Sequence, residues 1–154
     1  MNPAFAEFLQ LSTQDRQDVF DNTAEQRNTL STYIEKDFWV CLVLDILYNG
    51  LPYGHPRLLF KGGTSISKVH QLIHRFSEDV DLVVFRDDLG FEGDNDPSNP
   101  ELSGKQRKRL FQELKDAAAT YLCGKLKDDL SQLAAVIGPD SKIILDEADP
   151  DNST

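Results

Sequence analysis

The sequence feature that most constrains this chain is a pair of aspartates, Asp79 and Asp81, at the start of the apolar run DVDLVVF. Successive side chains of a β-strand point to opposite faces, so this spacing places both carboxylates on one face and Val80 and Leu82 on the other. Carboxylates this close repel each other unless a cation lies between them. Mg2+ binds carboxylate oxygens and keeps positions for water and phosphate oxygens. The pair therefore predicts a magnesium site, although a solvated strand end has the same pattern.

A strand, a double-glycine turn and a helix precede the two aspartates. Leu58–Phe60 predicts the strand, and Gly62 and Gly63 let the backbone turn sharply and approach a ligand closely. The helix expected from Thr64 to about His74 offers free N–H groups and a positive dipole end, as phosphate-binding turns do. Strand-to-helix turns also use glycine for packing alone. The residues that we expect to contact a nucleotide are Lys61, Gly62, Gly63, Thr64, Ser65, Lys68 and Ser77.

Helical patterns dominate the first fifty residues. Residues 1–30 predict an N-terminal helical segment, in which Ser12 with Asp15 three positions later marks a helix start. A second helix is expected from Thr32 to Tyr48, with Thr32 and Glu35 as a capping box and Asn49-Gly50 as its end. Its triplet Glu35, Lys36, Asp37 has two interpretations: simple capping of the helix, or Glu35 or Lys36 lying over a neighbouring site.

The second half of the chain alternates an irregular segment with a long helix. Residues 86–104 are rich in Gly, Pro, Asp and Asn and predict an exposed loop. A long helix is expected from Lys105, interrupted near Gly124 and ended by Gly138-Pro139. Its basic start, KQRKR, predicts either a solvated face or a patch that contacts an RNA backbone. Lys142–Asp146 predicts a third strand, and residues 147–154 predict a disordered acidic tail.

Length and charge bound the class of protein. A chain of 154 residues with ordinary apolar content predicts one globular domain over residues 1–154. The net charge of -10 argues against a surface that binds nucleic acid everywhere. No apolar run is long enough for a membrane span and no signal peptide is evident, so a cytoplasmic protein is expected. Cys41 and Cys123 have no metal-binding spacing and are expected to be buried reduced thiols.

Together these segments resemble a known family. KGGTSISK followed by RFSEDVDL, and the upstream EKDFWVCLVL, are similar to the AbiEii/AbiGii-type nucleotidyltransferases, a branch of the DNA polymerase beta-like nucleotidyltransferase superfamily. The resemblance implies an α/β (α+β) fold in which helices flank a mixed β-sheet. It implies Mg2+-dependent transfer of an NMP group from an NTP to an RNA (tRNA) or protein acceptor. It also implies a toxin of a toxin–antitoxin or abortive phage-defence system, with a cognate antitoxin protein as partner.

The chain departs from the superfamily pattern at one position. The third carboxylate of the superfamily lies on a later strand, where Asp146 is the candidate in this chain. We therefore expect Asp79 and Asp81 to be catalytic and to bind the metal, in a domain that is incomplete at its C-terminus. The alternative is a truncated, catalytically inactive nucleotidyltransferase-fold module that acts through protein or RNA binding.

Overall fold

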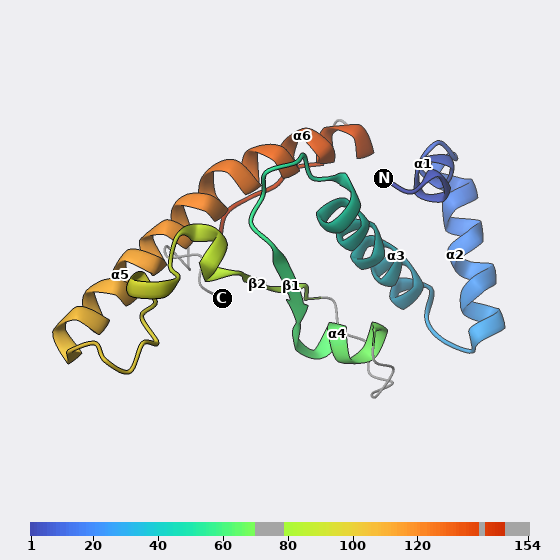
Figure 1. Ribbon diagram of the computed structural model, residues 1–154. Coiled ribbons are helices and arrows are strands. Elements are labelled where there is room, and N and C mark those ends of the chain that lie inside the picture. Colours follow the sequence, from blue (N-terminus) through green and yellow to red (C-terminus); the bar gives the residue numbers. More distant parts are fainter. Residues whose placement is uncertain (70–78, 139–140, 147–154) are drawn as a thin grey trace. The chain divides into compact units, whose positions relative to one another are not determined.

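The computed structural model describes residues 1–69, 79–138 and 141–146 (Figure 1). Helices dominate these residues and accompany a two-stranded antiparallel sheet, which confirms the α+β fold class. The chain divides into two compact units: unit 1 is Met1–Leu51 with Phe60–Leu82, and unit 2 is Pro52–Leu59 with Val83–Thr154. The single nucleotidyltransferase domain expected over residues 1–154 stays a prediction. Within the residues described, no helix combines the length and the apolarity that a membrane span requires.

Aromatic side chains form the centre of unit 1. They come from α1 (Pro3–Leu9), α2 (Thr13–Arg27) and α3 (Ser31–Asp45), of which α2 and α3 pack directly against each other. The rings of neighbours in this cluster have centroids 4.5–5.8 Å apart. Aromatic rings bury large areas, so these contacts dominate the packing of the three helices. The members of the cluster are Phe5, Phe8, Phe20, Phe38 and Trp39.

Of the two helix starts predicted in unit 1, the structure confirms one and contradicts the other. The Ser12 hydroxyl accepts a hydrogen bond from the Asp15 N–H at the start of α2, as predicted. The predicted capping box of Thr32 and Glu35 is wrong, because Leu30 precedes α3 without a capping side chain and Thr32 already lies in the first turn. A π-helical turn, η1 (Ile46–Gly50), continues α3 and ends at the predicted Asn49-Gly50.

The sheet and the glycine turn come next in the chain. The strand β1 (Leu58–Lys61) has the predicted position and is one residue longer. The helix α4 (Gly62–Lys68) begins at the first glycine instead of at Thr64, and the remainder of the predicted helix falls on residues 70–78, outside the described residues. The strand β2 (Asp81–Val84) begins at the second aspartate, two residues later than predicted.

A long helical rod forms the main element of unit 2. The helix α5 (Gly104–Tyr121) runs through the π-helical turn η4 (Leu122–Leu126) into α6 (Lys127–Ile137) without a break in the ribbon (Figure 1). The π turn contains Gly124, where an interruption was expected, and Gly138 follows the last helical residue as predicted. Ser103 caps α5 in a capping box with Gln106, which fixes the start of the rod.

Ion pairs hold the segment between β2 and α5. It contains two 3-10 turns, η2 (Arg86–Leu89) and η3 (Gly93–Asn95), where an exposed loop was predicted. The Arg86 guanidinium lies 2.8 Å from the Asp96 carboxylate. Arg57 donates to Asp88 through its backbone N–H, Nε and Nη2, at 2.7–2.9 Å, and its guanidinium lies over the Phe85 ring. The segment is therefore fixed by charge more than by apolar burial.

A second polar network holds the segment Pro52–Leu59 to the rod of unit 2. The ring of His55, whose side chain is 7% exposed, has Nδ1 2.9 Å from the Tyr121 hydroxyl and Nε2 2.9 Å from the Asp129 carboxylate. Lys125 donates to the same carboxylate at 2.9 Å. The ionised Asp129 carboxylate can only accept, so Nε2–H of His55 donates to it, and the Tyr121 hydroxyl is hydrogen-bonded to the other ring nitrogen.

The end of the described chain differs from the prediction. Lys142–Asp146 forms no strand, so the predicted third strand is wrong, and Ile144 is 82% exposed. A strand needs a neighbour to pair its backbone N–H and C=O groups, and β1 and β2 pair with each other. The tail at residues 147–154, predicted to be disordered, lies outside the described residues.

Candidate functional site

The second aspartate packs directly on the glycine turn in unit 1. A Cβ atom built on Gly62 would lie 1.8 Å from Oδ2 of Asp81 and 2.7 Å from its Cγ. Gly62 also has φ +76°, a backbone conformation that side chains disfavour. The position therefore requires glycine for two independent reasons. The structure brings together the turn and the carboxylate that the sequence singled out separately.

A buried hydroxyl fixes the first aspartate. The Thr64 Oγ1 donates to the backbone carbonyl of Asp79 at 2.6 Å, and Thr64 is only 1% exposed. Its neighbour Ser65 is also buried. The Thr64 hydroxyl, expected to contact a phosphate, thus ties Asp79, two residues before β2, to the first turn of α4.

The two carboxylate residues lie on the solvent side of their segment. Asp79 and Asp81 are exposed, whereas Val80 and Leu82 are partly buried, which is the alternation that a period of two produces. Gly62 leaves the space beside the Asp81 carboxylate free of its own side chain. Two exposed oxygen donors beside an open backbone turn fit Mg2+, which takes its other ligands from water and phosphate.

The structure places no further metal ligand beside the two aspartates in the described residues. In the described part of the chain, no group of three or more His, Cys, Asp and Glu side chains gathers as metal ligands. Ser77 falls outside the described residues. Asp146, the candidate for a third carboxylate, belongs to unit 2, whereas the aspartate pair belongs to unit 1. The metal and nucleotide assignments stay predictions.

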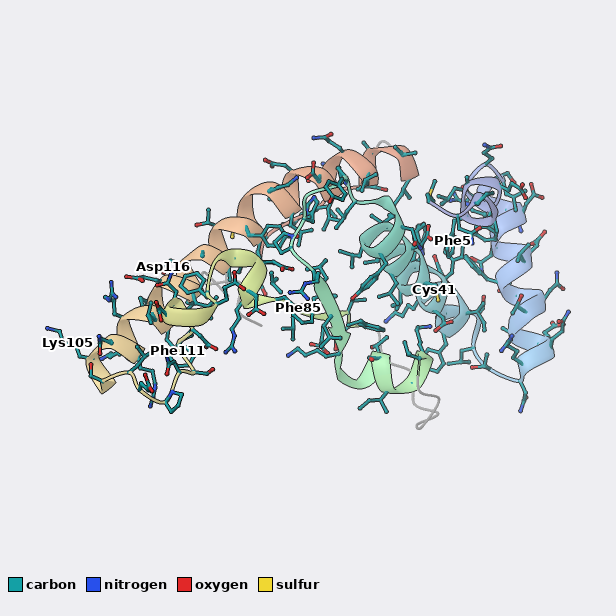
Figure 2. The ribbon with its side chains drawn as sticks, in the orientation of Figure 1. Phe5, Cys41, Phe85, Lys105, Phe111 and Asp116 are labelled. Carbon is teal, nitrogen blue, oxygen red and sulfur yellow. The ribbon has the colours of Figure 1, made fainter. Side chains whose placement is uncertain are left out.

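The lysine of α4 has partners on α3. The Lys68 ammonium forms an ion pair with the Asp37 carboxylate and donates to the Cys41 sulfur at 3.5 Å (Cys41 is labelled in Figure 2). The Lys68 side chain is 18% exposed and that of Asp37 is 49% exposed. Asp37 is therefore a member of the triplet Glu35, Lys36, Asp37 that reaches α4, and the interpretation that Glu35 or Lys36 lies over a site stays a prediction. Sequence reasoning noted the triplet but had no signal for this pairing across 31 residues.

The end of β1 is tied to α3 through Tyr48 of η1. Burial raises the pKa of the Tyr48 phenol above its ordinary value of 10.0, and a backbone hydrogen bond with Phe60 lowers it in part. Phe60 is followed by Lys61, an exposed residue in extended conformation just before α4. The turn that presents Gly62 is thus anchored on both sides, by Tyr48 before it and by the Thr64 hydroxyl after it.

Comparison with known proteins identifies the family. The family described as "Nucleotidyl transferase AbiEii toxin, Type IV TA system" matches residues 45–147, about two thirds of the chain. The matched range includes the glycine turn, both aspartates and the helical rod. It does not include the triplet Glu35, Lys36, Asp37 on α3. No curated protein and no solved structure matches the chain. The chain belongs to the AbiEii family of nucleotidyltransferase toxins, from type IV toxin–antitoxin systems.

Proposed function

We propose that this chain transfers an NMP group from an NTP to a hydroxyl of an RNA (tRNA) or protein acceptor, in a Mg2+-dependent reaction. The contact between Gly62 and Asp81 supports this proposal, because it brings the glycine turn proposed to bind phosphate beside the carboxylate proposed to bind the metal, within one compact unit. Membership of the AbiEii family supports the reaction class and the role as a toxin. In this role the enzyme acts in the cytoplasm and is counteracted by a cognate antitoxin protein.

Each residue of the turn has a proposed part in the reaction. Asp79 and Asp81 would hold Mg2+, which when bound stabilises the charge that develops on the transferred phosphoryl group by several kcal/mol. The oxygen of the acceptor hydroxyl bonds to the α-phosphorus and its proton passes to solvent. The bond between the α-phosphorus and the oxygen that bridges to the β-phosphate breaks, and pyrophosphate leaves with that oxygen. The residues proposed to bind the nucleotide are Lys61, Gly62, Gly63, Ser65, Lys68 and Ser77.

Two further residues position these groups. Thr64 holds the Asp79 backbone through its 2.6 Å hydrogen bond, so it orients a proposed metal ligand. Asp37 holds Lys68 through their ion pair and keeps the ammonium at the last turn of α4. The ion pair thus orients the side chain that is proposed to bind phosphate.

Asp81→Asn tests the proposed metal ligand. We expect transfer of label from an α-labelled NTP to fall about a hundredfold or more, because loss of several kcal/mol of charge stabilisation has that effect on a rate. Asp94→Asn, which neutralises an exposed acid of unit 2, is the matched control and should leave transfer unchanged. Assays with total tRNA and with protein as acceptors distinguish the two acceptor classes. Full transfer by Asp81→Asn would exclude the assignment.

Gly62→Ala tests the contact itself. The new Cβ would displace the Asp81 carboxylate, so transfer should be lost although both proposed metal ligands, Asp79 and Asp81, are still present. Gly104→Ala is the control, because a Cβ there meets no atom within 4 Å. The fluorescence of Trp39, the only tryptophan, checks that unit 1 is folded. An active, folded Gly62→Ala variant would contradict the role of this contact.

The alternative is an inactive module that acts through protein or RNA binding. It is favoured by one observation: the described residues hold no third acid beside the aspartate pair. Calorimetric titration separates the two functions, since an enzyme of this class should bind an NTP with heat that depends on Mg2+ and is lost in Asp81→Asn. Growth arrest on expression, relieved by the cognate antitoxin, would support the toxin.

A further inference from the structure

The most exposed tyrosine of the chain lies on the segment that joins η1 to β1. Tyr53 is 105% exposed, so its ring and its hydroxyl are fully accessible to solvent. Gly54, the next residue, has φ +96°, a backbone conformation that favours glycine, and a Cβ built on it would meet no atom within 4 Å. Tyr53 is therefore presented on a turn that is itself open to solvent.

The backbone on both sides of this turn is restrained. His55, whose side chain is 7% exposed, is hydrogen-bonded through both ring nitrogens, and Arg57 donates three hydrogen bonds to Asp88. Pro52 restricts the chain just before the turn. A side chain on a restrained backbone loses less conformational entropy when it enters a binding site than one on a mobile segment. The segment therefore holds Tyr53 ready for a second molecule.

The other three tyrosines are less accessible. Tyr121 is buried and hydrogen-bonded. Tyr48 is half-exposed and forms a hydrogen bond with the backbone of Phe60. Tyr33 is also half-exposed, on α3. Tyr53 is thus the phenol that a second molecule can reach most easily.

The charge around Tyr53 suits the approach of an anion. From residue 46 to residue 77 the sequence contains no Asp or Glu, although the chain has a net charge of -10. The two carboxylates that the segment contacts, Asp88 and Asp129, are each paired with a cation. An NTP is an anion, and unpaired carboxylates beside an acceptor hydroxyl would repel it. The segment therefore meets an electrostatic requirement for an acceptor of a nucleotidyl group.

Tyrosine is one of the side chains that serve as nucleophiles in covalent steps, and its phenol loses a proton more readily than an alkyl hydroxyl does. We propose that Tyr53 of one copy of this chain is an acceptor of the NMP group in the site of a second copy. Its oxygen bonds to the α-phosphorus and its proton passes to solvent, while the bond from the α-phosphorus to the bridging oxygen breaks and pyrophosphate leaves. The proposal rests on the proposed function and deepens it by naming a protein acceptor. Transfer between copies requires only that the hydroxyl be accessible, which Tyr53 satisfies.

Self-labelling tests the acceptor. The parent chain is incubated with Mg2+ and each α-labelled NTP in turn, without any added acceptor, and label on the protein is measured after denaturing electrophoresis. Tyr53→Phe removes only the hydroxyl and should reduce the label about tenfold or more. Tyr33→Phe is the matched control at a half-exposed position and should keep the label within about twofold of the parent. Mass spectrometry should find the NMP on the peptide that contains Tyr53. Equal label in Tyr53→Phe and the parent would overturn the proposal.

A mixture of two variants tests transfer between copies. Tyr53→Phe keeps the proposed site and lacks the acceptor, whereas Asp81→Asn keeps the acceptor and lacks a proposed metal ligand. A purification tag on one variant separates the two on the gel. Asp81→Asn should be labelled in the mixture and not alone, and the double variant should be labelled in neither. A labelled parent together with an unlabelled Asp81→Asn in the mixture would overturn transfer between copies.

Nitration with tetranitromethane tests the accessibility of the hydroxyl without catalysis. In the parent chain without NTP, Tyr53 should be nitrated before the buried Tyr121, as peptide masses will show. Prior self-labelling should protect Tyr53 from the reagent. Resistance of unlabelled Tyr53 to nitration would overturn the proposal, because a second copy could not reach its hydroxyl either.

The outcomes separate this proposal from the proposed function. Tyr53→Phe should transfer NMP to an added RNA or protein acceptor as the parent does. Transfer by the parent to an added acceptor without any self-labelling would overturn the role of Tyr53 and leave the proposed function. Absence of transfer to every acceptor, Tyr53 included, would contradict both.

Discussion

The two compact units of this chain are held together by different kinds of contact. In unit 1 the helices α1, α2 and α3 meet through a cluster of five aromatic rings. In unit 2 the segments that pack on the rod are fixed by polar side chains, through His55 to Tyr121 and Asp129, and through Arg57 to Asp88. Apolar contacts depend little on pH, whereas hydrogen-bonded ionisable groups depend on it strongly.

Because of this difference, we expect a fall in pH to reduce the stability of unit 2 more than that of unit 1. Hydrogen bonds from Arg57 hold the pKa of Asp88 below its ordinary value, those from Ser98 do so for Asp96, and that from Lys125, with a smaller effect of His55, does so for Asp129. In unit 1, Ser31 and Gln17 lower the pKa of Asp21 in the same way. A lowered pKa gives stability that is present above the ordinary carboxyl pKa and is lost as pH falls through the folded-state value. Among the residues that the structure describes, unit 2 has three such carboxyl groups and unit 1 has one.

Phe20→Ala should have the largest effect, and on unit 1 alone. Phe20 is buried and touches the rings of Phe8 and Phe38, so its truncation should reduce the free energy of unfolding by about 3–5 kcal/mol. Urea unfolding followed by Trp39 fluorescence measures unit 1 specifically. Val19→Ala, at an exposed neighbouring position, should cost less than about 0.5 kcal/mol. Equal costs for both would mean that the ring cluster does not hold this unit.

His55→Ala should have the next largest effect, and on unit 2. It removes two hydrogen bonds and leaves the Tyr121 hydroxyl and the Asp129 carboxylate without this partner, which costs about 1–3 kcal/mol. Hydrogen exchange of residues 52–59 should accelerate, while Trp39 reports no change in unit 1. Lys125→Met, which removes an ion pair between a half-exposed lysine and Asp129, should cost less than about 1 kcal/mol. Unchanged exchange in His55→Ala would show that the network is not needed.

Tyr121→Phe should have a smaller effect on stability at neutral pH, of about 1 kcal/mol, because only one hydroxyl is lost. Burial, and next the charge of Asp129, raise the pKa of Tyr121 to about 12. The phenol of the unfolded chain ionises near 10. The contribution of the protonated Tyr121 hydroxyl to the stability of the folded protein is therefore complete below pH 10 and is lost as the pH rises towards 12. Tyrosinate absorbance of the parent should show a late step that Tyr121→Phe removes and Tyr53→Phe, at an exposed position, retains.

The sequence was informative wherever a structure depends on neighbours in the chain. Ser12 caps α2 through a residue three positions away, Gly138 follows the rod, and Gly124 lies in its π turn. These three features could be predicted because each is decided by short-range geometry. The contact of Gly62 with Asp81 depends in addition on the pairing of β1 with β2, which brings the end of one strand beside the start of the next.

Two of the failures depend on distant partners, and the third depends on the residue at which a helix begins. Lys142–Asp146 has the apolar pattern of a strand, but a strand forms only against an available edge. Thr32 and Glu35 have the spacing of a capping box, but α3 starts one residue earlier, right after the extended Leu30. The pairing of Asp37 with Lys68 joins residues 31 positions apart and leaves no local signal. The periodicity of apolar residues shows which face of a helix or strand is buried, but it does not show which other segment packs against that face.

Gly124→Ala should have the smallest effect on stability, and Gly124 of unit 2 contrasts with Gly62 of unit 1. Gly124 lies in the π turn of the rod, its φ is not positive and an added Cβ meets no atom within 4 Å, unlike that of Gly62. Gly124→Ala should therefore stabilise unit 2 by about 0.5–1 kcal/mol, because alanine loses less backbone entropy on folding. Hydrogen exchange of the amides in α5 and α6 should slow by a few fold, which follows from the same free energy. Faster exchange would show that the π turn needs glycine for its backbone and not only tolerates it.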